Sequence, residues 1–172
     1  MRDPYPQVNA PPVGAAARTG DWLGALRRYL LAIVLGNLAW EAAQLPLYTI
    51  WHESSPSEIL FAVLHCTGGD ILIAAMALLG ALLLAGDRRW PEARFRRVAA
   101  LTVLGGLAYT VFSEWLNTDI RGSWAYTEVM PRLPLIGTGV SPLAQWLVVP
   151  LAALWWSRRP FPRAKQAKET DS

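Results

Sequence analysis

The stretch Gly86-Asp-Arg-Arg-Trp-Pro-Glu-Ala-Arg-Phe-Arg-Arg97 decides the fold class of this chain, because it sets five arginines between two long apolar stretches. Of the 16 lysines and arginines, all but Arg121 and Arg132 lie in this segment or toward the two ends of the chain. Basic residues at alternate ends of apolar stretches are typical of a multi-pass membrane protein whose basic segments face the cytoplasm. The pattern predicts that both termini are cytoplasmic.

The composition favours the same class of protein. At 172 residues, 53% hydrophobic and only 17% charged, the chain is more apolar than an ordinary soluble domain. The basic residues flank apolar stretches and form no stripe interleaved with aromatics, so the bilayer is the expected partner and nucleic acid is not. The excess of arginine over lysine and the many alanines and leucines are associated with bacteria, which suggests the bacterial cytoplasmic (inner) membrane.

Four apolar stretches predict an all-α fold, a four-transmembrane-helix bundle over residues 26–157. The second stretch, at roughly 40 Å, is longer than the hydrocarbon core, so it must tilt or break, and Gly68 and Gly69 offer a break. The proline-rich and polar ends predict disordered cytoplasmic tails. The predicted spans are about 29–50, 59–85, 98–116 and 141–157, and the predicted tails are 1–25 and 158–172.

The segments at the predicted outer face set where the helices begin. Ser57 before Glu58 predicts the start of the second span. Ser141 and Pro142 predict an N-cap and a first helical residue for the fourth span, which leaves a length of roughly 24 Å, marginal for a crossing. We therefore expect residues 118–140 to fold over the outer end of the bundle as a capping loop.

Polar residues inside the first span share one helix face. Asn37, Glu41 and Gln44 are spaced i, i+4, i+7 and must face the bundle. One interpretation is that they only hydrogen-bond neighbouring helices and fix the packing. The other is that an ionisable group in a membrane marks a functional site. On that hypothesis Glu41 is a catalytic acid or base, and Asn37 and Gln44 bind a ligand.

The third and fourth spans add polar groups at similar depths. Thr110, Glu114 and Asn117 again share one face, and Gln145 lies about one turn into the fourth span. From the outer boundary, Glu114 and Gln145 are predicted roughly 5 Å deep and Glu41 roughly 14 Å deep. The sequence therefore predicts a polar pocket in the outer half of the bundle, with Glu114 as a second catalytic candidate and Gln145 as a ligand-binding candidate.

The second span contains a possible metal site. His65 and Asp70 point about 140° apart on an ideal helix, and they can converge only if Gly68 and Gly69 distort it. Together with carboxylates they would suit zinc, manganese or iron, so the candidate cofactor is a divalent metal. Alternatively, His65 is a packing residue and Asp70 is protonated or partnered by another polar group.

The loop from Asp119 to Pro131 is rich in aromatic residues. These form an interfacial belt or, alternatively, Trp124 and Tyr126 line the access for an apolar tail while Arg121 binds an anionic head group or pairs with Glu114 or Asp119. Five tryptophans near span ends fit the belt: Trp22, Trp51, Trp90, Trp155 and Trp156. Four remain as pocket candidates: Trp40, Trp115, Trp124 and Trp146.

Several of these motifs occur together in one family. They are Asn37-Leu-Ala-Trp-Glu41, His65-Cys-Thr-Gly-Gly-Asp70, Glu114-Trp-Leu-Asn117, Arg121-Gly-Ser-Trp-Ala-Tyr126, Met130-Pro131 and Ser141-Pro-Leu-Ala-Gln-Trp146. With them, residues 29–157 resemble a family of small four-span bacterial inner-membrane proteins. The resemblance implies a membrane bundle and transfers no activity.

Two functions from different classes fit the sequence. The first is a non-catalytic membrane protein, an accessory subunit or a binder of a small ligand such as a lipid or isoprenoid. The second is a membrane-embedded enzyme, with or without a bound metal, that acts on a lipid or isoprenoid. An oligomer or a partner membrane protein is compatible with both.

Overall fold

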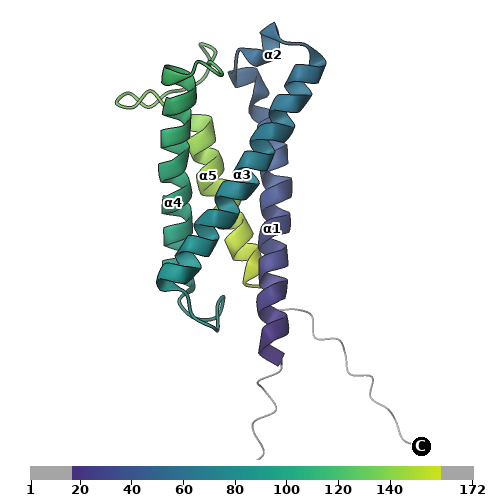
Figure 1. The fold of residues 1–172 in the computed structure, drawn as a ribbon, viewed down its shortest axis with the longest axis vertical. Helices are drawn as coiled ribbons and strands as arrows, with labels where there is room; N and C mark the ends of the chain where they lie inside the picture. Colours follow the sequence, from purple (N-terminus) through teal and green to yellow (C-terminus); the bar gives the residue numbers. More distant parts are fainter. Residues whose placement is uncertain (1–16, 160–172) are drawn as a thin grey trace, which may run out of the picture.

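The computed structural model describes residues 17–159, with side chains from Trp22 onward. This part of the chain is all-helical, and it contains no β-strand beyond two isolated bridges. The predicted tails, apart from residues 17–25 and 158–159, lie outside the described residues. In order, the elements are α1 (Ala17–Gln44), η1 (Leu45–Leu47), α2 (Ile50–Glu53), α3 (Pro56–Ala85), α4 (Phe95–Trp115), η2 (Leu116–Ile120) and α5 (Val140–Ser157) (Figure 1).

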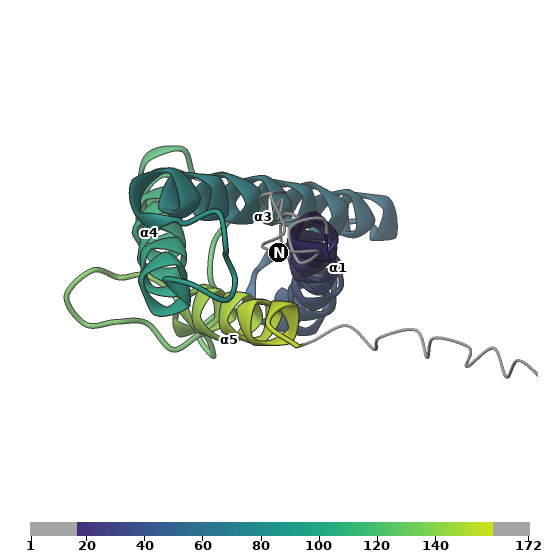
Figure 2. The same ribbon diagram turned by 90° about the horizontal axis from the view of Figure 1, so that it is seen from below.

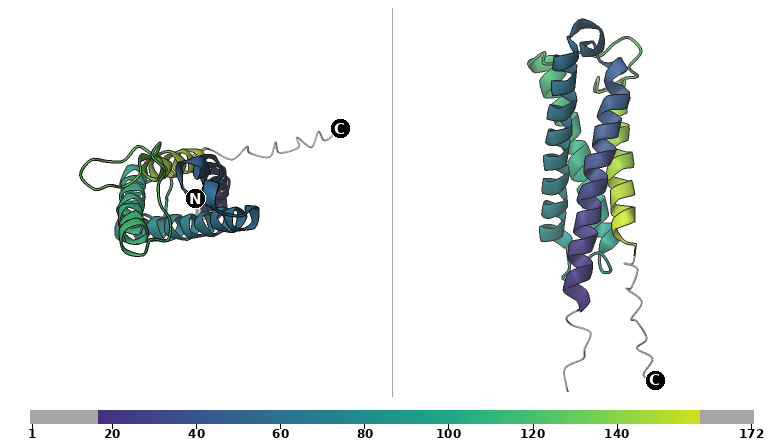
Figure 3. Two further views of the ribbon diagram at one scale, coloured as in Figure 1. Left: turned by 90° about the horizontal axis from the view of Figure 1, so that it is seen from above. Right: turned by 90° about the vertical axis from the view of Figure 1, so that its right-hand side faces the viewer.

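The four long helices form a closed ring, which confirms the predicted bundle. α1 packs against α3 and α5, and α4 packs against the same two helices, so the bundle is square when viewed along its axis (Figures 2 and 3). All four segments are long and apolar enough to cross a membrane, as expected of a multi-pass membrane protein. These segments are Trp22–Leu47, Pro56–Ala85, Phe95–Ile120 and Val140–Ser157.

The first helix is displaced from its predicted range. α1 begins at Ala17, within the segment predicted to be a disordered tail, and it ends at Gln44, where residue 50 was predicted. Pro46 has no N–H to continue the α-helical bonding pattern, and the chain tightens there into the 3₁₀ turn η1. The polar face of α1 therefore lies in its last two turns.

The predicted start of the second span is wrong, and of the two predicted ways to fit its length, tilting or breaking, the structure shows tilting. The N-cap is Ser55, two residues before Ser57, because the Glu58 side chain accepts a hydrogen bond from the Ser55 N–H at 2.8 Å while Ser55 caps the Glu58 N–H. α3 then runs unbroken through Gly68 and Gly69 for 30 residues. Its excess length is taken up by an oblique course across the bundle (Figure 1).

The fourth span begins one residue earlier than predicted and is not capped by Ser141. Gly139 is the N-cap and α5 starts at Val140. The Ser141 hydroxyl instead donates to the side-chain oxygen of Gln44 at 2.8 Å. The hydroxyl that was predicted to cap α5 therefore joins α5 to α1.

The end of the bundle that holds residues 86–94 is the arginine end, and it is filled by a packed apolar core. Trp90 is only 1% exposed because the 86–94 loop folds under the helices, so its assignment to an interfacial belt is wrong (Figure 2). The Tyr29 hydroxyl donates to the Ala74 carbonyl at 3.2 Å and ties α1 to α3. The opposite end, which holds α2 and residues 121–139, is the loop end, and it contains the polar residues.

Candidate functional site

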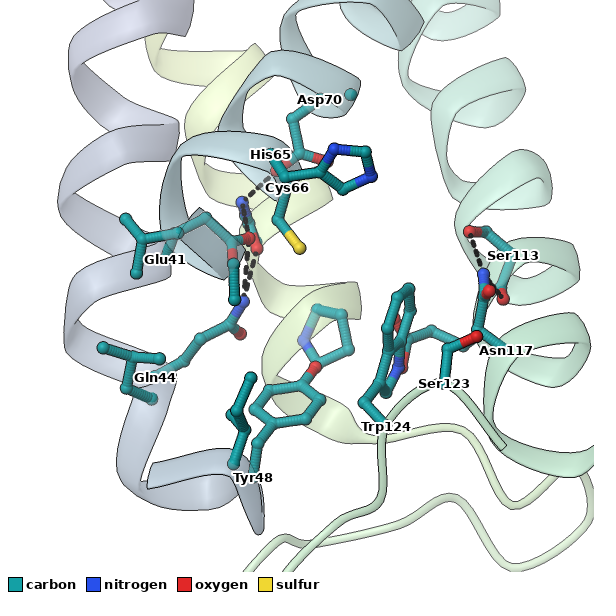
Figure 4. A pocket seen from close by; sticks show the side chains of 18 of the residues that line it. Glu41, Gln44, Tyr48, His65, Cys66, Asp70, Ser113, Asn117, Ser123 and Trp124 are labelled. Atoms are coloured by element: carbon teal, nitrogen blue, oxygen red, sulfur yellow. Dashed lines mark hydrogen bonds between the residues drawn. The ribbon is translucent and has the colours of Figure 1, made fainter. Parts of the chain in front are cut away.

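A cavity of about 880 Å³ lies between the four helices at the loop end. All four long helices and the loop that follows η2 contribute to its wall, as Figure 4 shows for labelled residues of α1, α3, α4 and this loop. Two of the predicted site residues, Asn37 and Tyr126, lie behind the wall and contact residues that form it. The other eight line the cavity: Glu41, Gln44, His65, Asp70, Glu114, Arg121, Trp124 and Gln145.

Gln145 forms the centre of the cavity floor. Its side-chain nitrogen lies 3.0 Å from the Asn37 oxygen, 3.0 Å from a Glu41 oxygen and 2.8 Å from an Asp70 oxygen. The side chain is only 2% exposed, so these partners replace water completely. One amide thus joins α1, α3 and α5.

A chain of hydrogen bonds leads into this centre from the loop end. The Trp40 indole donates to the Ser141 hydroxyl at 3.2 Å, and Ser141 donates in turn to Gln44. The Gln44 amide nitrogen donates to Glu41 at 2.9 Å and to the Gln145 oxygen at 3.2 Å. Every donor points toward the carboxyl groups, so Glu41 and Asp70 are the final acceptors of the chain.

Glu41 and Asp70 are neighbours, because both carboxyl groups accept a hydrogen bond from the same Gln145 nitrogen, at 3.0 and 2.8 Å. Two carboxylates at such a distance in a medium of low dielectric constant would repel strongly. A proton shared between them, or a cation bound beside them, removes this repulsion. The floor can therefore hold a proton or a positive charge.

The loop-end wall is built around Tyr126. Its hydroxyl donates to the Glu114 carboxyl and accepts a hydrogen bond from the Gly139 N–H at 3.1 Å, and its ring lies 5.4 Å from that of Tyr48. Burial, with the Glu114 carboxyl nearby, raises the pKa of both phenols, so both remain neutral donors. Tyr126 thus ties residues 121–139 to α4, and two backbone hydrogen bonds, from the Thr127 N–H to the Leu47 carbonyl at 3.0 Å and from the Val140 N–H to the Pro131 carbonyl at 2.7 Å, tie them to η1 and α5, as a capping loop would be.

His65 and Asp70 have different partners in the structure. His65 is exposed and stacks on Phe61, with ring centroids 5.4 Å apart, whereas Asp70 contacts Gln145. α3 is not distorted at its two glycines, so the condition for a metal pair is not met. Between residues 17 and 159, no three histidine, cysteine, aspartate or glutamate side chains are placed to hold a metal ion. The predicted divalent metal has no support in this geometry.

Arg121 is exposed at the mouth of the cavity and forms no ion pair with any described residue. Glu114, its predicted partner, accepts a hydrogen bond from the Tyr126 hydroxyl and also lies beside the Trp124 indole. Tyr48, which continues the polar face of the first span in the sequence, lines the wall, and so do two aromatic side chains that the sequence did not single out, Phe61 and Tyr109. Phe61 and Tyr109 are exposed on the outer surface of their helices, so no local pattern marks them as cavity residues. Only the packing of the bundle places them at one cavity.

Searches against protein families, curated proteins and solved structures found no match for this chain.

Proposed function

We propose that this protein binds a small amphipathic ligand, a lipid or an isoprenoid, in the cavity at the loop end of its bundle. The observation that carries the proposal is a cavity of about 880 Å³ whose lining combines apolar and aromatic side chains with a hydrogen-bonded polar floor. Ligand pockets commonly measure about 300–1,000 Å³ and combine mostly apolar walls with a few placed polar groups. Since the floor groups are hydrogen-bonded to one another, the empty pocket keeps its shape.

We propose that the arginine end faces the cytoplasm of a bacterium and that the cavity lies in the outer half of its cytoplasmic membrane. Five arginines in residues 88–97 support this orientation. A reporter that is active only in the cytoplasm is expected to be active when fused after Ser172 and inactive when inserted after Leu135, which is 97% exposed in the 121–139 loop. The reverse pattern would overturn the orientation.

Filling the cavity is expected to remove the bound ligand. A Cβ atom on Gly69 would meet no atom within 4 Å, and Gly69 lines the cavity, so a Gly69→Leu side chain can occupy its space without a clash. Lipid extracts of purified protein, analysed by mass spectrometry, should contain an enriched species in the wild type that is lost from this variant.

Gly68→Leu is the matched control. Gly68 also has no neighbour within 4 Å, but it does not line the cavity, so its new side chain points to the surroundings. This variant is expected to retain the enriched species. If both variants retain it, or if the wild type carries no enriched species at all, the proposed binding site is wrong.

An enzyme that acts on the same class of ligand is the second candidate, and the closeness of Glu41 and Asp70 favours it. A carboxyl pair that shares a proton can serve as both acid and base. Extracts from a Glu41→Gln variant distinguish the two functions. An enzyme accumulates a chemically different ligand in this variant, whereas a binder retains the same molecule in a smaller amount.

A further inference from the structure

The charges around the cavity are unevenly distributed. Four carboxyl groups line it, and one guanidinium group, that of Arg121, lies at its mouth. The deep carboxyls belong to the floor, where two of them are neighbours. An anionic head group at the floor would therefore be repelled, whereas a positively charged group would be attracted. The four carboxyl groups are those of Glu41, Glu58, Asp70 and Glu114.

A buried hydroxyl on the same wall points independently to a ligand. Thr110 lines the cavity, is only 5% exposed, and its hydroxyl oxygen has no hydrogen-bond partner among the described residues. A buried polar group without a partner destabilises the protein. The oxygen itself has almost no accessible surface, so a ligand N–H donor can reach it only when the Thr110 side chain turns toward the cavity.

The walls also suit a positive charge. Five aromatic side chains line the cavity, and the faces of aromatic rings attract cations. Two of these side chains, Trp124 and Trp146, stand close to Glu114 and Asp70 respectively. The five are Tyr48, Phe61, Tyr109, Trp124 and Trp146.

The cavity opens sideways, between α3 and α4. The two helices are close at Gly105, where an added Cβ would lie 3.9 Å from Ala77, and they diverge toward the loop end (Figure 1). Phe61 on α3 and Tyr109 on α4 both line the cavity, yet they are 68% and 48% exposed. Wall residues that are also exposed on the lateral surface mark an opening toward the bilayer.

We infer that the ligand is an amphipathic amine, whose protonated nitrogen lies at the polar floor and whose apolar chain leaves between α3 and α4 into the bilayer. This inference rests on the proposed ligand-binding function and narrows its ligand class. The sequence predicted that Arg121 binds an anionic head group, whereas this inference places a cationic head group at the carboxyl groups of the floor.

Three probes with one chain length test the inference. Radiolabelled dodecylamine, dodecanol and dodecyl sulfate are titrated onto the full-length protein in phosphatidylcholine nanodiscs, and binding to Gly69→Leu nanodiscs is subtracted. Dodecylamine should bind saturably, one per protein and at least tenfold more tightly than the other two. Gly68→Leu should bind it as the wild type does.

Two substitutions locate the nitrogen. Glu41→Gln should weaken dodecylamine binding about tenfold. Thr110→Val keeps the shape of the side chain, so it should weaken amine binding severalfold without lowering the thermal unfolding midpoint, which keeps the test valid if Glu41→Gln fails to fold.

The possible failures are distinguishable. If dodecanol or dodecyl sulfate binds the cavity as tightly as dodecylamine, the amine is the wrong ligand and the proposed binding function stands. If amine binding is unchanged in both Glu41→Gln and Thr110→Val, the placement of the nitrogen is wrong. If no probe distinguishes the wild type from Gly69→Leu, both proposals fail.

Discussion

A Gly106→Ala variant is expected to lose most of its folded bundle in detergent. An added Cβ at this position would fall inside the van der Waals envelope of the Trp146 ring, which packs across α4 from α5. Trp146 is itself 3% exposed and belongs to the apolar core, so a shift of its ring would disturb the packing of α4 against α5. Overpacking of a rigid core typically costs about 1–3 kcal/mol, and an overlap with a ring should exceed that range. The thermal midpoint, followed by size-exclusion chromatography, measures the loss.

The neighbouring glycine supplies the control. At Gly105 the nearest atom to an added Cβ is the Ala77 methyl carbon at 3.9 Å, an ordinary contact. Gly105→Ala should therefore keep the midpoint, or raise it through a helix preference of about 1 kcal/mol. Equal midpoints for the two variants would contradict the close approach of α4 to α5.

The second large effect is expected from Gln145→Leu. Leucine has a similar volume but cannot hydrogen-bond, so the oxygen atoms of Asn37, Glu41 and Asp70 would lose a shared donor. Each buried acceptor left without a partner costs about 1–3 kcal/mol, although interhelical hydrogen bonds in membranes average nearer 0.6 kcal/mol. Because three partners are affected together, we expect the thermal midpoint to fall clearly and the ligand to be lost.

Val148→Ala, on the same helix, is the matched control for this experiment. Val148 is 53% exposed on the outside of the bundle, and its apolar side chain forms no hydrogen bond. Its truncation should leave both the midpoint and the bound ligand close to wild type. A Gln145→Leu protein as stable as this control would show that Gln145 does not hold the floor together.

The sequence predicted the bundle because two signals reinforce each other over long segments. The length of each apolar segment predicts one membrane crossing, and the positions of the arginines predict which ends of these segments lie on the same side of the membrane. The helical spacing of Asn37, Glu41 and Gln44 likewise placed them on one face, and that face does meet the cavity floor. Periodicity fixes which residues share a face, so this part of the site could be predicted.

The partners across helices could not be predicted in the same way. That Gln145 contacts three helices depends on the rotation of α5 about its own axis, which no local pattern specifies. Ser141 was predicted to be a helix cap from its neighbours in the sequence, yet its hydroxyl donates to the Gln44 side chain on α1. Trp90 looked interfacial from its position at the end of a span, but the loop around it folds inward. In each case a tertiary contact overrides a local preference.

The unequal lengths of the helices have a consequence for the membrane around them. α3 has 30 residues and α5 has 18, so one is about 45 Å long and the other about 27 Å. Only a slanted α3 fits the same hydrocarbon layer as α5. This slant separates α3 from α4 at the loop end, where the cavity opens between the two helices. A thicker bilayer lets α3 stand more upright and narrows that separation. The acyl-chain length of the surrounding lipids is therefore expected to change the width of the opening between α3 and α4.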